Sequence, residues 1–159
     1  MGTQAGRDQE RSQGQGAVQA TSSSSYNDAQ GQAQWSANQA TGVPNVENYR
    51  DNGNARAPKA PDAGSEWLDL KYAKPVHAEE VRIRESCGSG AVTKVEVFDE
   101  QGAAHTVWAG NDPTTELNYL IVTPPQTAFK TDRVKITLAT NVIPGWSEID
   151  AVQLVGSEQ

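Results

Sequence analysis

The chain has 159 residues, of which 36% are hydrophobic, and its 20 acidic and 13 basic residues leave a formal net charge of -7 at pH 7. This length suits one domain with its own hydrophobic core. The negative charge argues against nucleic acid and anionic membrane surfaces as partners, because both are bound through clusters of Lys and Arg. Neutral ligands such as sugars, or a cation such as calcium, remain compatible with it.

Cys87 is the only cysteine, so neither an internal disulfide nor a zinc site built on cysteines is possible. We expect a reduced thiol that is partly buried at the end of a strand. No apolar run reaches the length of a membrane helix, so we expect no membrane insertion. No signal-peptide core follows Met1, and we therefore expect a leader or an upstream domain to precede this sequence in the parent protein.

The first part of the chain is polar. Residues 1–16 are rich in Gln, Gly and charge without apolar periodicity, which predicts a disordered head or linker before a folded domain over residues 17–157. We expect a first strand at Ala17–Ser23 and, after a polar loop, one helical turn at Trp35–Gln39 with Ser36 as its N-cap. Residues 43–65 form the longest irregular stretch of the domain, and loops of this length often carry function.

Short segments with alternating apolar residues then follow one another, separated by Gly and Pro. In the segment Asp132–Ala139, Val134, Ile136 and Leu138 alternate with polar residues, which is the pattern of a strand with one buried face. The other segments are Trp67–Tyr72, Glu79–Ser86, Ala91–Phe98, His105–Ala109, Leu117–Thr123 and a closing strand at 149–155. About eight short strands without a long helix predict an all-β fold, an eight-stranded antiparallel jelly-roll β-sandwich.

The C-terminal stretch is the most informative part of the sequence. Pro144 and Gly145 predict a turn, Trp146 is a large apolar anchor, and Glu148 stands where the turn becomes the closing strand. We expect this closing strand to lie inside a sheet with a neighbour on each side, because a terminal strand at an edge would fray.

Four segments together carry a family resemblance. The closing segment Gly145–Gly156 reads Gly-Trp-Ser-Glu-Ile-Asp-Ala-Val-Gln-Leu-Val-Gly. With Trp35–Asn45, Glu66–Leu70 and Ala91–Asp99, it resembles bacterial discoidin-like modules (F5/8 type C, galactose-binding-like) in order and spacing, over about residues 17 to 156. The resemblance implies a jelly roll from a secreted or cell-surface bacterial protein, and it leaves the ligand open because the family binds many things.

Catalysis finds little support in the sequence. His77 and His105 are the only histidines, and neither lies near a serine or cysteine in a recognised nucleophile motif. A glycosidase needs two carboxylates across a cleft, whereas the carboxylate pairs of this chain stand at expected strand ends or turns, where charge keeps a surface hydrated. We therefore predict no catalytic residues and a chain that is not an enzyme. The carboxylate pairs are Glu79 with Glu80, Asp99 with Glu100 and Glu148 with Asp150.

A calcium site is the cofactor that the sequence favours. Calcium prefers six to eight oxygen ligands from irregular chain, and the loop from Asn38 to Asn45 offers side-chain oxygens at Asn38, Thr41 and Asn45 and the carbonyl of Ala40. In similar jelly-roll modules, the loop after the first strand shares a structural cation with a glutamate just before the last strand, which here is Glu148. The alternative is that Glu148 accepts hydrogen bonds from loop amides without any metal.

The expected ligand surface is the loop end of the sandwich. Most of the four tryptophans should be core residues, but Trp146 lies on a loop, and Tyr49 and Arg50 form a pair suited to stacking and hydrogen bonding. We therefore predict a non-catalytic ligand-binding module, monomeric in isolation, that recognises carbohydrate on a glycan or cell-surface partner through Tyr49, Arg50 and Trp146. The alternative is a structural or protein–protein interaction module without a small ligand.

Overall fold

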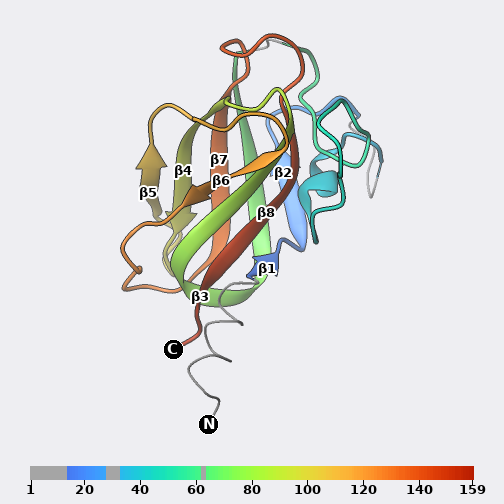
Figure 1. The fold of residues 1–159 in the computed structure, drawn as a ribbon. Helices are drawn as coiled ribbons and strands as arrows, with labels where there is room; N and C mark the ends of the chain where they lie inside the picture. The colour runs from blue at the N-terminus through green and yellow to red at the C-terminus, as the bar shows by residue number, and fades with distance from the viewer. Residues whose placement is uncertain (1–13, 28–32, 62–63) are drawn as a thin grey trace.

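The computed structural model describes residues 14–27, 33–61 and 64–159, and within them the chain forms an antiparallel β-sandwich (Figure 1). The predicted all-β, eight-stranded fold is confirmed. The elements are β1 (Gln15–Gly16), β2 (Gln19–Ser22), the 3-10 turn η1 (Ala37–Ala40), β3 (Ser65–Cys87), β4 (Val92–Phe98), β5 (Ala104–Ala109), β6 (Asn118–Val122), β7 (Thr131–Ala139) and β8 (Glu148–Ser157).

Two sheets are joined by β3, which contributes to both of them. Its first half lies between β2 and β7 in the order β2-β3-β7-β4-β5, and its second half lies between β8 and β6 in the order β1-β8-β3-β6. The register with β7 shifts between Lys71 and Val76, around Pro75, which cannot donate to a strand ladder. The two segments expected at 67–72 and 79–86 are therefore one bent strand.

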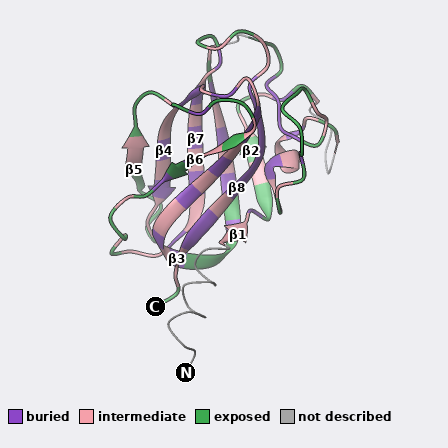
Figure 2. Cartoon of the chain, in the orientation of Figure 1, coloured by how far each residue is buried: buried purple, intermediate pink, exposed green. Residues whose placement is uncertain are grey.

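The core lies between the sheets and follows the alternation of the sequence. Val134, Ile136 and Leu138 of β7 face inward, as do Val81 and Ile83 of β3, and all five are buried (Figure 2). The predicted inward positions of these two strands are confirmed. Burial on this scale is the main driving force for the fold.

The closing strand β8 lies between β1 and β3, as expected. Its neighbour β1 lies within the segment predicted to be a disordered head, and there the prediction is wrong. Gln15 pairs with Leu154 and Gly16 with Gln153, and the side-chain amide of Gln15 donates to the carbonyl of Lys74. The boundary of the folded part therefore lies before Gln15. The part of the prediction that concerns residues 1–13 falls outside the described residues.

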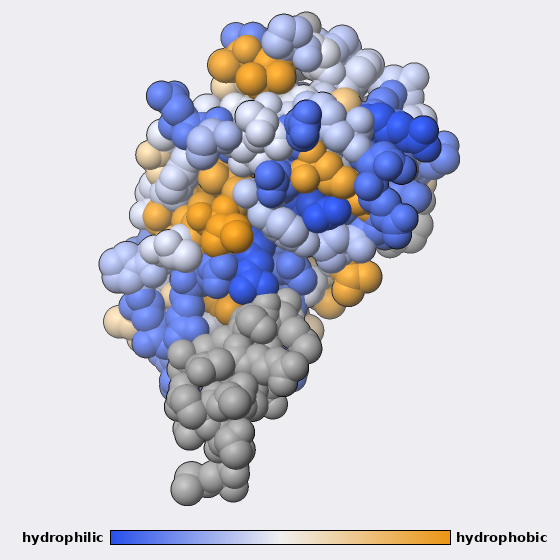
Figure 3. All heavy atoms as spheres, in the orientation of Figure 1, coloured by the Kyte–Doolittle hydropathy of each residue, from blue (hydrophilic) through white to orange (hydrophobic). Residues whose placement is uncertain are grey.

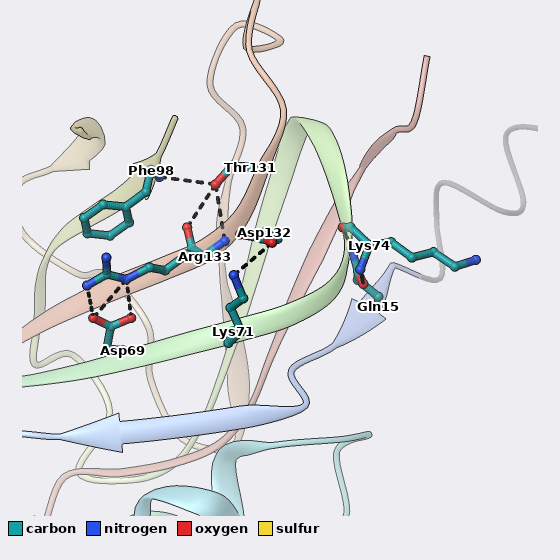
Figure 4. A network of polar contacts seen from close by, with 8 residues as sticks. All are labelled: Gln15, Asp69, Lys71, Lys74, Phe98, Thr131, Asp132 and Arg133. Carbon is teal, nitrogen blue, oxygen red and sulfur yellow. Dashed lines mark hydrogen bonds and ion pairs between the residues drawn. The ribbon is translucent and has the colours of Figure 1, made fainter. Parts of the chain in front are cut away.

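Polar contacts join the outer surfaces of β3, β4 and β7 (Figure 4). Arg133 forms an ion pair with Asp69 at 2.6 Å, and its guanidinium lies 3.8 Å from the ring centroid of Phe98. Lys71 pairs with Asp132 at 2.9 Å. These exposed or half-exposed pairs contribute little stability each. Among the described residues, no helix has the length and hydrophobicity needed to cross a bilayer.

Candidate ligand-binding site

Three aromatic side chains from distant parts of the chain meet at the loop end of the sandwich. Tyr26 packs edge-on against both Trp35 and Trp146, with ring centroids 5.3 Å apart in each pair. Together with Asp51 and Ala57 they line a pocket of about 90 Å³. Tyr26 is 54% exposed, so this aromatic pocket, as we call it, is open to solvent.

The backbone around residues 53–57 holds the first two aromatics in position. The amide of Tyr26 donates to the carbonyl of Ala57 at 2.9 Å, and the amide of Trp35 donates to that of Gly53 at 3.0 Å. Trp35 has a φ of +59°, which is uncommon for a bulky residue and is held here by its neighbours. Residues in such conformations are often found at binding sites, which makes Trp35 a candidate for function.

Asp51 supplies the polar group of the pocket. The indole Nε1 of Trp35 donates a 2.7 Å hydrogen bond to Asp51 Oδ1, which orients the carboxylate and fixes the indole ring. Asp51 is exposed, so its carboxylate can also accept hydrogen bonds from a ligand. The pocket thus combines apolar ring faces with an oriented acceptor.

Glu148, at the start of β8, lies next to Asp51. Its Oε1 accepts a 3.0 Å hydrogen bond from the amide of Asn52, and its buried carboxyl also interacts with the side chains of Asp51 and Cys87. Burial first, and then the neighbouring Asp51 carboxyl, raise the pKa of Glu148 to about 8.

Cys87 is a free, half-buried thiol at the end of β3, as predicted. Burial raises its pKa most, and the nearby carboxyls of Glu148 and Asp51 add to the effect, so that the pKa is about 11.

The loop from Asn38 to Asn45 is tied to β8 through a different acid from the one expected. The amides of Asn45 and Val46 donate to the Asp150 carboxylate at 3.1–3.2 Å, and Arg84 pairs with Asp150 at 3.3 Å. The carbonyl of Asn38 accepts bonds from the amide and hydroxyl of Thr41. Ala40 is buried within η1, which packs against β2 and β8.

The residues predicted to bind calcium are thus distributed over three places. Glu148 meets Asn52 and Asp51, Asn45 meets Asp150, and Asn38 and Thr41 bond to one another. Among the described residues, no group of three His, Cys, Asp or Glu side chains is arranged to hold a metal ion. Any cation in this region would therefore also use backbone or hydroxyl oxygens.

Tyr49 and Arg50 directly precede Asp51 and are exposed, as expected of a platform. The Tyr49 hydroxyl accepts a 3.3 Å hydrogen bond from the amide of Ser89, and the Arg50 amide donates to the carbonyl of Ser86. These bonds hold the Tyr49 side chain and the Arg50 backbone beside the connection between β3 and β4, and both residues remain exposed. Of the three residues predicted to contact carbohydrate, Trp146 lines the pocket. Tyr49 and Arg50 do not line it, but they directly precede Asp51, which does.

Sequence reasoning missed Tyr26 and Trp35 as site residues. Tyr26 lies in a polar loop, and Trp35 was expected in a helical turn that the structure places at Ala37–Ala40, after Trp35. Ser36 precedes that turn as its N-cap residue but makes no side-chain capping bond. The available signal was the presence of two large aromatics in a segment otherwise composed of small and polar residues.

The comparisons with known proteins agree with this fold. The family described as "Pappalysin-1, SD scarf domain, C-terminal" matches residues 7–159. The chain belongs to this family. No curated protein matches it.

Solved structures similar to this SD scarf domain include several carbohydrate-binding modules. Chitosan-binding module 1 of a chitosanase/glucanase from Paenibacillus sp. IK-5 has 15% identity and a TM-score of 0.64, and the match covers 87% of this chain and 94% of that one. The CBM32 of AlyQ, in complex with 4,5-unsaturated mannuronic acid, has 12% identity and a TM-score of 0.61, with 89% and 96% covered. A pectin-binding module has 15% identity and a TM-score of 0.59, with 87% and 89% covered. At these identities the likeness establishes the galactose-binding-like fold, which confirms the expected discoidin-like architecture.

Proposed function

We propose that this SD scarf domain is a non-catalytic carbohydrate-binding module and that the aromatic pocket is its ligand site. The observation that carries the proposal is the meeting of Tyr26, Trp35 and Trp146 around one open pocket beside the Asp51 carboxylate. Aromatic faces suit the apolar C–H faces of sugar rings, and a few oriented polar groups then select the hydroxyls. The similar folds that bind chitosan, pectin and a mannuronic acid derivative support this reading.

The size of the pocket suggests how much of a glycan it would hold. Its volume of about 90 Å³ is well below the roughly 300–1,000 Å³ of sites that enclose drug-sized ligands. One sugar residue would therefore contact the aromatic rings while the rest of the glycan extends into solvent. Tyr49 and Arg50, which continue the chain from Asp51, would contact that outer part.

Charge narrows the class of sugar. Asp51 lies in the pocket, and the whole chain carries a formal charge of -7 at pH 7. Uronic acid polymers would meet repulsion there, since like charges at short range are unfavourable. Neutral sugars, or amino sugars such as those of chitosan, would be bound more tightly than pectin fragments.

We also propose that calcium binds between Asp51 and Glu148 and has a structural role. Two adjacent carboxyls, from the long loop and from the start of β8, fit the preference of this ion for oxygen donors. The ion would tie the long loop to the start of β8. Chelation should then lower the melting temperature of the wild type, and Glu148→Gln should remove most of that effect. In protein shown to be metal-free, an unchanged melting curve would contradict the calcium proposal.

Isothermal titration with chitotriose and with trigalacturonic acid tests the carbohydrate proposal, after a glycan array has surveyed other sugars. Trp146→Ala and Tyr26→Ala should each weaken binding of the best glycan at least tenfold. Trp67→Ala is the matched control, because Trp67 lies under Lys135 on the outer face of β3 and should leave binding unchanged. Circular dichroism checks the fold of each variant. Binding to no glycan, or equal losses for Trp67→Ala and Trp146→Ala, would refute the proposed site.

The rival function is a structural or protein-interaction module without a small ligand. On the face shown in Figure 3, apolar side chains form separate patches among hydrophilic residues. Stable protein interfaces usually have a continuous apolar centre, so this face favours a polar ligand. We further propose that the parent protein is secreted or displayed at the cell surface, where a glycan-binding module meets its ligand.

A further inference from the structure

We propose that the aromatic pocket is a cage for a methylated ammonium group, such as the one that ends choline. Its walls are Tyr26, Trp35 and Trp146, and the Asp51 side chain lies beside them. Such a ligand goes beyond carbohydrate. It would use the same pocket, but its binding does not require that the pocket binds a sugar.

The three rings of the pocket stand at large angles to one another and do not form a stack. The plane of Tyr26 makes an angle of 72° with that of Trp35 and 89° with that of Trp146, and the ring centroids are 5.3 Å apart in each pair. A group inside the pocket therefore meets aromatic rings from more than one direction. A sugar ring stacks on one open ring face, whereas a compact cation is attracted by each ring around it, because its charge interacts with every ring quadrupole.

The size of the pocket limits the group that enters it. A cavity of roughly 150 Å³ holds one benzene molecule, and this pocket has a volume of about 90 Å³. A pyranose ring is therefore too large to be enclosed, although it can rest against the opening. A methylated ammonium group is more compact than such a ring. The pocket thus fits the cationic end of a ligand whose remainder stays in solvent.

Asp51 supplies the negative charge that such a cation needs. Its carboxylate accepts the 2.7 Å hydrogen bond from the indole Nε1 of Trp35, which holds it against one wall of the pocket. Of the described residues that line the pocket, Asp51 alone is charged. The formal net charge of -7 at pH 7 gives the whole chain the same sign, which favours the approach of cations.

The small number of hydrogen-bond acceptors favours a methylated ammonium over a primary one. A primary ammonium carries several N–H donors and is strongly hydrated, so its entry into a pocket requires several acceptors. Within the described lining of this pocket, only the side chains of Asp51 and Tyr26 can accept a hydrogen bond. A quaternary ammonium has no N–H group and loses no hydrogen bond when it enters. The aromatic walls and the single charge are then sufficient for recognition.

The backbone at Trp35 is an observation independent of the ring geometry. Its φ of +59° is uncommon for a bulky residue. Its amide donates to the carbonyl of Gly53 at 3.0 Å, and its carbonyl accepts a bond from the amide of Ala57 at 3.1 Å. Strained backbone of this kind clusters at ligand sites, where the surrounding structure enforces it. The ring is thus held in place before a ligand arrives, which lowers the ordering cost of binding.

Isothermal titration with choline and with neohexyl alcohol tests the cage in chelator-treated protein, where no metal ion occupies Asp51. Neohexyl alcohol is the neutral isostere of choline, with carbon in place of nitrogen. The wild type should bind choline at least about tenfold more tightly than the alcohol, because only choline offers a charge to the rings. Equal affinities, or no binding of choline, would overturn the proposal. This comparison needs no variant, so it does not depend on the stability of one.

Variants of the pocket separate its charge from its shape. Asp51→Asn should weaken choline binding at least about fivefold without weakening that of the alcohol, because it removes the charge and keeps the size of the side chain. Glu158→Gln is the matched control, since it removes the same charge at the exposed C-terminal end and should leave choline binding unchanged. Tyr26→Phe keeps the ring and should retain binding, whereas Tyr26→Leu should lose it. Equal losses for Asp51→Asn and Glu158→Gln would overturn the cage.

The cage and the carbohydrate site can fail separately. Choline binding by a protein that binds no glycan would support the cage and refute the carbohydrate proposal. Glycan binding without a preference for choline over neohexyl alcohol would refute the cage alone. Once choline binds, sedimentation with phosphatidylcholine vesicles would assign the cation to a lipid head group, and choline binding without sedimentation would assign it to a soluble ligand.

Discussion

Tyr72 links the two sheets through a single buried hydrogen bond, and its removal allows a quantitative test of the fold. Tyr72 is 2% exposed, and its hydroxyl donates a 2.9 Å bond to the carbonyl of Val152 in β8. Tyr72→Phe keeps the ring and deletes the donor, which leaves a buried carbonyl without this partner. We expect a loss of about 1–2 kcal/mol in the free energy of unfolding at pH 8.

The difference in unfolding free energy between the wild type and Tyr72→Phe should shrink at alkaline pH. Burial raises the pKa of Tyr72 far above its usual value, whereas the unfolded chain ionises this tyrosine near pH 10. Below pH 10 the hydroxyl is protonated in both states and its contribution is complete. Above pH 10 only the unfolded state gains by losing the proton, so the wild type loses about 1.4 kcal/mol by one pH unit above that value. Tyr72→Phe lacks this loss, and the difference between the two proteins should nearly vanish at pH 11.

Urea denaturation followed by tryptophan fluorescence at pH 8 and pH 11 measures both effects. Other groups titrate in both proteins, so their contributions cancel in the difference. A difference that stays constant between the two pH values would refute the buried position of the Tyr72 hydroxyl. A negligible difference at pH 8 would refute its hydrogen bond to β8.

Three further predictions concern the backbone, the N-terminal boundary and the thiol. Gly88→Ala should lower the free energy of unfolding, measured by urea denaturation, by at least about 2 kcal/mol, because φ is +57° and the new Cβ would collide with the carbonyl of Trp146. Gly102 also has a positive φ but lies in open space, so Gly102→Ala should lower it by only about 1 kcal/mol. Deleting residues 1–13 should leave the melting temperature unchanged, whereas deleting residues 1–16 should lower it by several degrees because β1 is lost; equal melting temperatures would show that β1 is dispensable. Cys87 should react slowly with a thiol reagent at pH 7.5, because its pKa of about 11 leaves little thiolate, and rapid labelling of the folded protein would contradict this.

Local pattern was enough to predict the strands of this domain. Alternation in β7 identified Val134, Ile136 and Leu138 as core residues, and the Pro-Gly turn followed by an apolar run identified β8. Such patterns succeed because a strand in a sandwich buries every second side chain. The sequence also determined the fold class, since short strands at regular spacing without a long helix leave few other architectures.

The same rule failed where loops cover the outer face of a strand. Residues 148–152 of β8 are all buried, because the long loop after η1 packs on the side that alternation assigns to solvent. Asp150 is therefore buried and holds the amides of Asn45 and Val46. Its polar character had suggested an exposed position, and only the packed loop reveals its role.

The candidate sites depended on contacts between residues far apart in the chain. Tyr26 and Trp146 are 120 positions apart, yet their rings lie 5.3 Å from one another, and Asp51 of the long loop lies beside Glu148 at the start of β8. No local pattern encodes such pairs, because the loops that carry them are placed by the sandwich and have no periodicity of their own. The sequence by itself determined which segments form strands and which faces they bury. Only the tertiary structure decided which loop residues meet at the end of the sandwich, because that depends on how the packed sheets position the loops between them.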